Sequence, residues 1–344
     1  MTERNSYFDM LRGIAIVMVV AIHCFGLVYN AENFDGLAFV VRNLLNCAVP
    51  IFCVSSAFFL FPKDLSGKNY IAFLKKQVAR VYLPMLFWSL GWLALDLHKG
   101  KAIGTGLVKL FTCDYSVYYF VAVIIQFYIL LPLFQKIMKG NKVNLFILLS
   151  LLATTAYMAI YSYVIKGIYH VELPLLLYAG PILCHLVYFV LGNSLSNKKV
   201  YSVKLFLGIA VFSIIAMCIE SHYLMGQSGF PVGLGIKASS VLYSLSVCVV
   251  LYSIRGYVKG RLSALLQTLG RFSFGIYLSH VYFIQVLHKV VNKCIAPPLQ
   301  EHSSPLLNLF VWFVIVCIVV AMDYGCLYVV KKCVPNFSKR FIGV

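Results

Sequence analysis

Charged residues are scarce in this chain of 344 residues: Asp, Glu, Lys and Arg make up only 12% of it. A soluble protein of this length carries about twice that share. No hydrophilic block is long enough to form a separate soluble domain, and the composition is 61% hydrophobic. We therefore expect an all-α polytopic membrane protein with one integral membrane domain over residues 1–344.

Metal-ligand patterns are also missing. The 11 cysteines are scattered singly, and no Cys-x-x-Cys or Cys/His spacing occurs. Cysteines of this kind usually pack as small apolar residues. The sequence thus predicts no metal site and no bound cofactor.

Long uncharged runs recur along the whole chain. Each is long enough to be read as a membrane-spanning helix. We predict about ten spans, at residues 8–29, 37–61, 81–98, 117–135, 143–163, 175–195, 205–220, 238–254, 273–291 and 306–330.

Basic residues predict the orientation of these spans. The segments on one side hold 21 of the 29 Lys and Arg, and the segments on the other side hold eight. Under the positive-inside rule the basic side, which includes both termini, is cytoplasmic. Because the net charge of +18 is dispersed among these loops, we expect the lipid bilayer as a partner and no nucleic acid.

The first span carries the most informative residues. Arg12 and His23 are the only Asp, Glu, Lys, Arg or His in the apolar run Leu11–Val28, and they are eleven residues apart. On a helix they share a face and lie roughly 16 Å apart along the axis. If Arg12 marks one membrane surface, His23 lies near the midplane of a core about 30 Å thick, where a histidine suggests function.

Each residue of the first span has a functional and a structural interpretation. Asp9, three residues before Arg12, pairs with it on one helix face, which would orient the guanidinium toward an anionic ligand. His23 is a candidate general base toward a hydroxyl. The alternatives are that Arg12 is an interfacial anchor and that His23 only hydrogen-bonds a neighbouring helix.

Three further places carry candidate residues. The loop Pro62–Arg80 contains Lys75, Lys76 and Arg80, a set that suits phosphates but also anionic lipid. Tyr118 and Tyr119 place polar tips in an apolar span, as a sugar-binding face or as interfacial anchors. His280 lies within an apolar helix, where it needs a partner and is either structural or part of an active site.

Five segments together resemble the acyltransferase-3 family of integral membrane acyltransferases. The stretch "FDMLRGIAIVMVVAIHCFG" is similar to the first-span pattern Asp-x-x-Arg-Gly-x-Ala followed by a His, and "AVPIFCVSSAFFLF" is similar to the second-span pattern. The basic stretch "FLKKQVARVYLP" resembles the loop before the third span, and "QFYILLPL" and "SFGIYLSH" resemble later landmarks. The resemblance runs over the whole chain.

This resemblance implies an acyl-CoA donor in the cytosol, usually acetyl-CoA, and an acceptor hydroxyl on a cell-envelope sugar or glycolipid on the other side. It implies that His23 is catalytic with Arg12 as its partner in the motif, and that Arg80 belongs to the basic loop on the donor side. From charge and position we add Asp9 to the catalytic residues and assign Lys75, Lys76, Arg80 and Arg12 to the donor. It also implies a multi-pass protein of a bacterial inner or plasma membrane.

The chain departs from the family pattern at several places. Asn46 stands where many members have an Arg, and Arg42, one turn earlier, is placed to replace it. Tyr118 and Tyr119 lie near the position of a frequent His-x-Trp, and Ser56 is followed by Ala57 where the family commonly has Gly. We therefore assign Arg42, Asn46, Tyr118 and Tyr119 to the acceptor, and regard Ser56 and His280 as structural or active-site candidates.

Three functions follow as hypotheses, the third being a membrane sensor or scaffold without catalytic activity. The first is an O-acyltransferase in which His23 acts as general base or as acyl carrier. The second is a multi-span transporter or flippase for a small polar or lipid-linked solute, although no inverted repeat is visible. The acceptor and the oligomeric state are left open by the sequence.

Overall fold

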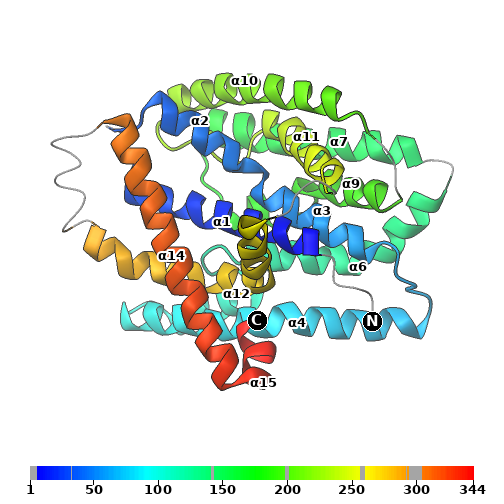
Figure 1. Ribbon diagram of the computed structural model, residues 1–344, viewed down its shortest axis with the longest axis horizontal. Helices are drawn as coiled ribbons and strands as arrows, with labels where there is room; N and C mark the ends of the chain where they lie inside the picture. The colour runs from blue at the N-terminus through cyan, green and yellow to red at the C-terminus, as the bar shows by residue number, and fades with distance from the viewer. Residues whose placement is uncertain are drawn as a thin grey trace. The chain divides into compact units, whose positions relative to one another are not determined.

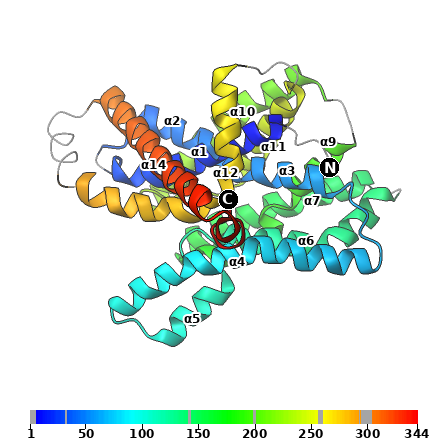
Figure 2. The same cartoon turned by 60° about the horizontal axis from the view of Figure 1, so that its bottom comes forward.

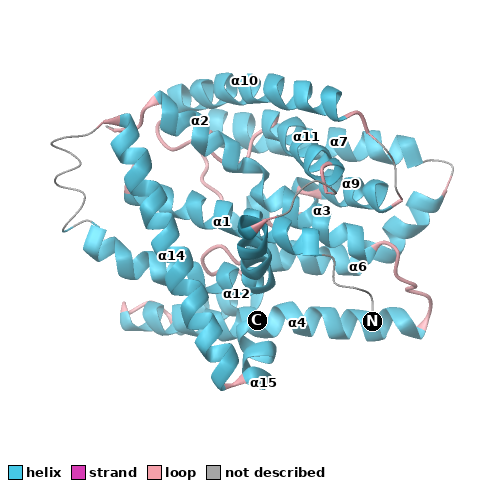
Figure 3. Cartoon of the chain, viewed as in Figure 1, coloured by secondary structure: helices cyan, strands magenta, loops and turns pink. Residues whose placement is uncertain are grey.

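The computed structural model describes residues 6–31, 33–140, 143–197, 201–255, 260–291, 293 and 304–344. Figure 3 shows helices joined by loops throughout these residues, and none of them forms a strand. The predicted all-α class is therefore confirmed.

Long apolar helices account for most of the predicted spans. Within the described ranges, seven helical segments are long and apolar enough to cross a membrane, so the chain is a polytopic membrane protein. The number of ten spans and the side of the termini stay predictions. The seven segments are Ser6–Leu27 (α1 and a 3-10 turn), Gly36–Leu60 (α2 and α3), Lys68–His98 (α4), Tyr119–Lys139 (α6), Val143–Ile168 (α7 and a π-helical turn), Val203–Ser228 (α10) and Pro305–Cys333 (α14).

The remaining predicted spans are shorter or more polar helices. The expected span 175–195 is broken into α8 (Leu175–Ala179), a 3-10 turn (Ile182–Cys184) and α9 (Leu186–Ser196). The break lies at Pro181, whose backbone is extended (ψ 137°) and which lacks the N–H that a continuing helix would need. The other two predicted spans correspond to α11 (Ser239–Ser253) and α12 (Arg261–Val290).

Two helices begin earlier than the sequence indicated. The helix α4 begins at Lys68 and α12 begins at Arg261, so each includes basic residues that we had placed in loops. One helix was missed: α5 (Ile103–Thr112) lies beside α4, as Figure 2 shows, and the Tyr82 hydroxyl donates to the Phe111 carbonyl at 2.8 Å.

The chain divides into two compact units, which are described separately. Unit 1 comprises Met1–Phe52, Met158–His170 and Val200–Tyr328, and unit 2 comprises Cys53–Tyr157, Val171–Lys199 and Val329–Val344. In unit 1, α1 packs along α12, and α10 packs on α2 and α11 (Figure 1). In unit 2, α4 contacts α5, α6 and the C-terminal turn Ser338–Ile342.

Candidate active site

Two glycines let α1 and α12 touch through their backbones. A Cβ atom on Gly13 would lie 1.9 Å from the Leu266 carbonyl oxygen, and one on Gly270 would lie 1.7 Å from the Asp9 carbonyl oxygen. Neither distance is compatible with a side chain at these positions. The glycine after Arg12 and the glycine before Arg271 therefore fix the crossing of the two helices.

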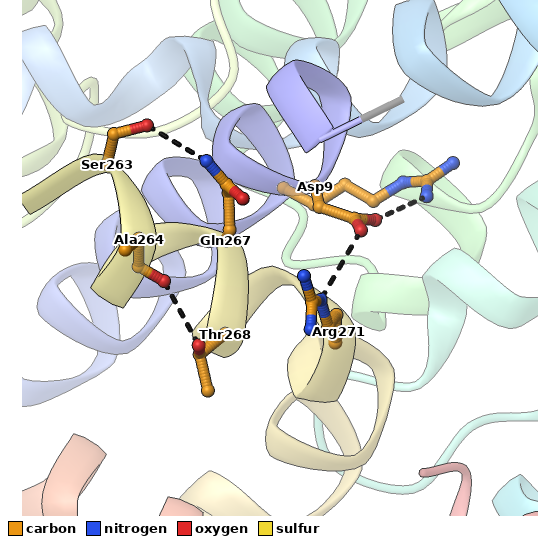
Figure 4. A network of polar contacts seen from close by, with 7 residues as sticks. Asp9, Ser263, Ala264, Gln267, Thr268 and Arg271 are labelled. Carbon is orange, nitrogen blue, oxygen red and sulfur yellow. Dashed lines mark hydrogen bonds and ion pairs between the residues drawn. The ribbon is translucent and has the colours of Figure 1, made fainter. Parts of the chain in front are cut away.

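An acid–arginine clamp lies at this crossing. The Asp9 side chain is only 2% exposed. One carboxylate oxygen lies 3.6 Å from Arg12 Nη1, and the other lies 3.7 Å from Arg271 Nε (Figure 4). The predicted Asp9–Arg12 pair is thus present, and a second arginine from α12 joins it. A buried carboxylate of this kind needs such compensation.

The far end of the same helix pair carries two histidines. His23 is the penultimate residue of α1, which ends at Cys24, so it lies in the half of the helix opposite to Arg12. The rings of His23 and His280 have centroids 5.2 Å apart and are inclined by 46°. The structure thus places together the two histidines that the sequence had put 257 residues apart.

His280 has a defined tautomer and one unused nitrogen. Its Nδ1 lies 3.0 Å from the Ile276 carbonyl oxygen, and because a carbonyl only accepts, Nδ1 carries the proton. Its Nε2 is buried and has no hydrogen-bond partner among the described residues. A buried lone pair without a partner is a site at which a donor from a substrate or from another ring would be stabilised.

A third helix, α14, supports this end of the pair. The Trp312 indole donates to the Ala21 carbonyl at 3.1 Å, two residues before His23. The Ser279 hydroxyl, next to His280, donates to the buried carboxylate of Asp323. These contacts hold the backbone beside both histidines without using their rings.

Arg42 and Asn46 also lie in unit 1. They flank the point where α2 gives way to a 3-10 turn at Leu45–Cys47, and Arg42 Nη1 donates to Asn46 Oδ1 at 3.2 Å. Both side chains are partly buried. The two residues suggested as alternatives for one family position are therefore direct partners, and their role toward an acceptor stays a prediction.

The other predicted site residues belong to unit 2. Lys75, Lys76 and Arg80 are exposed on α4. Desolvation, followed by the positive charges of Arg80 and Lys76, lowers the pKa of Lys63 in the preceding loop. These basic groups therefore influence one another, as expected of a surface that attracts anions.

The two tyrosines and Ser56 have packed surroundings within unit 2. Tyr118 is 1% exposed, and its hydroxyl accepts a hydrogen bond from the Trp92 indole at 3.2 Å. Tyr119 and Ser56 are partly buried. Their contact with an acceptor stays a prediction.

Sequence reasoning did not assign three residues that contribute to the helix crossing or to the buried polar contacts of unit 1. Arg271 was visible at the start of "RFSFGIYLSH", but its pairing with Asp9 depends on the helix crossing. Gly270 gave no signal, since a lone glycine in a polar stretch is ordinary. Lys237, fully buried in unit 1, was counted only as one of the basic residues on the less basic side.

The fold and site together define a class: a polytopic helical membrane protein whose first helix carries a buried acid–arginine clamp at one end and a histidine at the other. The family model described as an acyltransferase domain, that of the acyltransferase-3 family, matches residues 5–322. The chain therefore belongs to this family, and with it to the membrane acyltransferases.

Individual relatives are distant. Over 296 residues the chain is 24% identical to "Putative membrane-bound acyltransferase YfiQ" of Bacillus subtilis (strain 168), and the match covers 80% of each protein. Over 132 residues it is 31% identical to "Serine/alanine racemase" of Enterococcus gallinarum, which covers 35% of this chain and only 18% of the racemase. No solved structure matches the chain.

Proposed function

We propose that this protein transfers an acyl group, in the first instance acetyl, from cytosolic acyl-CoA to a hydroxyl of an extracytoplasmic carbohydrate or glycolipid. The observation that carries the proposal is the His23–His280 contact at the end of α1 opposite to Arg12, where the buried Nε2 of His280 has no hydrogen-bond partner among the described residues. The protein would lie in a bacterial plasma membrane.

The chemistry follows from one imidazole acting as base and then as acid. A neutral ring nitrogen of His23 takes the proton of the acceptor hydroxyl while its oxygen attacks the thioester carbonyl. The C–S bond then breaks, and the leaving thiolate takes the proton back to give CoA and an O-acyl ester. In the covalent variant, His23 itself holds the acyl group between two such steps. Acyl-CoA is a co-substrate, and the route uses no bound cofactor or metal.

We assign binding of the acyl-CoA donor to basic residues on the side that the positive-inside rule predicts to be cytoplasmic. The phosphates of CoA suit Lys75, Lys76 and Arg80 on α4 of unit 2. Arg12 on α1 of unit 1 is assigned to the donor separately, from its charge and its place in the sequence motif. Asp9 would hold the Arg12 guanidinium in place, because the pair is already formed in unit 1.

Purified protein in lipid nanodiscs provides the test. Wild type and the variants His23→Gln and His222→Gln are incubated with radiolabelled acetyl-CoA and glycolipid or glycan extracted from a strain that lacks the protein. His222 is exposed on α10 and serves as the matched control. We expect wild type and His222→Gln to transfer label, and His23→Gln to do so about 10²–10⁴-fold more slowly.

Two outcomes would contradict the proposal. Transfer by His23→Gln at the wild-type rate would remove the catalytic role of His23. Failure of the wild type to consume acetyl-CoA, with solute movement across proteoliposomes instead, would favour the transporter hypothesis.

A further inference from the structure

Arg42 has no anionic partner among the residues that the structure describes. Its one hydrogen bond among the described residues goes to the neutral amide oxygen of Asn46. The ion pairs within the described ranges join other residues: Asp9 with Arg12 and Arg271, and Asp96 with Lys101. A guanidinium that is taken partly out of water and offered only a neutral acceptor is not fully compensated.

Lys237 is a second cation whose hydrogen bonds, within the described part of the chain, go to neutral acceptors. It is 0% exposed, and its ammonium donates to the Asn43 side-chain oxygen and, at 2.8 Å, to the Gly233 carbonyl oxygen. Both acceptors are neutral. Asn43 is the residue next to Arg42 and also accepts from Ser221 on α10, so the ammonium is fixed beside α2 by packing and hydrogen bonds.

The nearest carboxylate is already engaged elsewhere. One oxygen of Glu220 accepts from the Tyr163 hydroxyl at 3.0 Å and from the Ala238 amide at 3.2 Å, and the other accepts from the Ser239 amide at 2.8 Å. These bonds satisfy the first amides of α11. Glu220 therefore contributes a favourable field to Lys237 without an ion pair at short range.

The two cations share one neighbourhood with the catalytic histidine. Arg42 lies within electrostatic range of both Lys237 and His23. Beside it, the Asn46 amide nitrogen is buried without a hydrogen-bond partner in the described part of the chain. One guanidinium, one unused amide N–H and a second positive charge nearby make an environment that favours an anion.

We propose that Arg42 and Asn46 bind an anionic group of the acceptor, a carboxylate or a phosphate, with Lys237 supplying a second positive charge nearby. The acceptor is then an acidic hydroxyl compound, such as a uronic acid or a phosphorylated sugar unit. This inference rests on the proposed acyl transfer and names the chemical class of its acceptor. Bound there, the anion would hold a neighbouring hydroxyl near His23.

Binding of small probes tests this without turnover. Calorimetry on protein in nanodiscs compares glucuronate, glucose 6-phosphate and neutral glucose at constant ionic strength. The variants are Arg42→Gln, which keeps a donor for Asn46, and Lys237→Met, which keeps apolar volume but no charge. Lys289→Gln, an exposed cation of α12, is the control.

We expect the acidic probes to bind and glucose to bind at least tenfold more weakly. Arg42→Gln should weaken acidic probes about ten- to hundredfold, Lys237→Met several-fold, and Lys289→Gln not at all. Preference for glucuronate or for glucose 6-phosphate identifies carboxylate or phosphate as the group. Equal binding of glucose and the acidic probes, or unchanged binding in Arg42→Gln, overturns the inference.

A donor contact would give a different pattern. If Arg42→Gln weakened acetyl-CoA binding and left glucuronate unaffected, the cation would serve CoA and the acceptor inference would be wrong. Loss of acetyl-CoA consumption by the wild type is a separate result, which bears on the proposed function and not on the binding of probes.

The pH profile provides a second readout. Burial, followed by the positive charge of Arg42, lowers the pKa of Lys237 to about 7; Glu220 and Cys218 from α10 act in the opposite direction. Lys237 thus loses its charge as pH rises through 7. Because glucuronate keeps one charge over this range, its affinity should fall several-fold from pH 6 to 8.5 and stay flat in Lys237→Met. A flat wild-type profile would remove Lys237 from the site.

Discussion

The two ends of the α1–α12 pair are built in opposite ways. At one end, a buried carboxylate is compensated by two arginines, and glycines bring the backbones into contact. At the other end, two histidines face each other and a buried nitrogen has no partner among the described residues. One helix pair therefore has a fully compensated end and an end with unused bonding capacity.

The acid–arginine end therefore fixes the position of the two helices, and the histidine end carries the groups available for chemistry. Backbone contact and ion pairs determine the register of the two helices, which determines where His23 and His280 meet. No side chain among the described residues bonds to the buried Nε2 of His280, which is the arrangement expected where a substrate supplies the missing donor. Substitutions at the helix crossing, at the histidine end and at the acid–arginine end should thus affect different quantities: the yield of folded protein, acetyl transfer and thermal stability.

The largest effect is expected from Gly270→Ala, which breaks the crossing on which both ends depend. The added Cβ would lie 1.7 Å from a backbone oxygen of Asp9, which no side-chain rotation relieves. We expect the yield of folded protein, measured by size-exclusion chromatography in detergent, to collapse. Gly325→Ala on α14, where a Cβ meets nothing within 4 Å, should leave the yield intact. Normal folding of Gly270→Ala would show that the close approach is not required.

The next effect isolates the histidine end. One alanine inserted after Val17 leaves Asp9, Arg12 and Gly13 in place but rotates His23 by about 100°. We expect acetyl transfer in nanodiscs to fall by about 10²-fold or more while the protein still inserts and purifies. The point variant Val17→Ala should keep its activity. Retention of activity by the insertion would mean that His23 does not act from a fixed position relative to Arg12.

The smallest effect isolates the acid–arginine end. Asp9→Asn removes the charge that compensates two arginines, one 32% and one 48% exposed in their side chains. Because both arginines reach solvent, we expect a loss of about 1–3 kcal/mol in stability, measured by thermal unfolding. Arg271→Gln should lose less, under about 1 kcal/mol, since Arg12 still pairs. Equal stability of Asp9→Asn and wild type would mean that the clamp does not stabilise the crossing.

Sequence reasoning predicted what local spacing determines. The i, i+3 pair Asp9–Arg12, the i, i+4 neighbours Arg42 and Asn46, and the apolar runs are all properties of single helices. Arg271 and Lys237 were not assigned because their side-chain partners, Asp9 and Asn43, lie more than 190 residues away in the chain. No periodicity reports which helix packs on which, so the second arginine of the clamp and the buried lysine required coordinates.

The crossing of α1 and α12 also has a consequence for biosynthesis. Asp9 and Gly270 are 261 residues apart, and at about 5–20 residues per second a ribosome needs tens of seconds to pass from one to the other. During that time Asp9 lacks the ion pair with Arg271, and His23 lacks the neighbouring ring of His280. The first helix therefore enters the bilayer before the helix that completes its polar contacts has been synthesised.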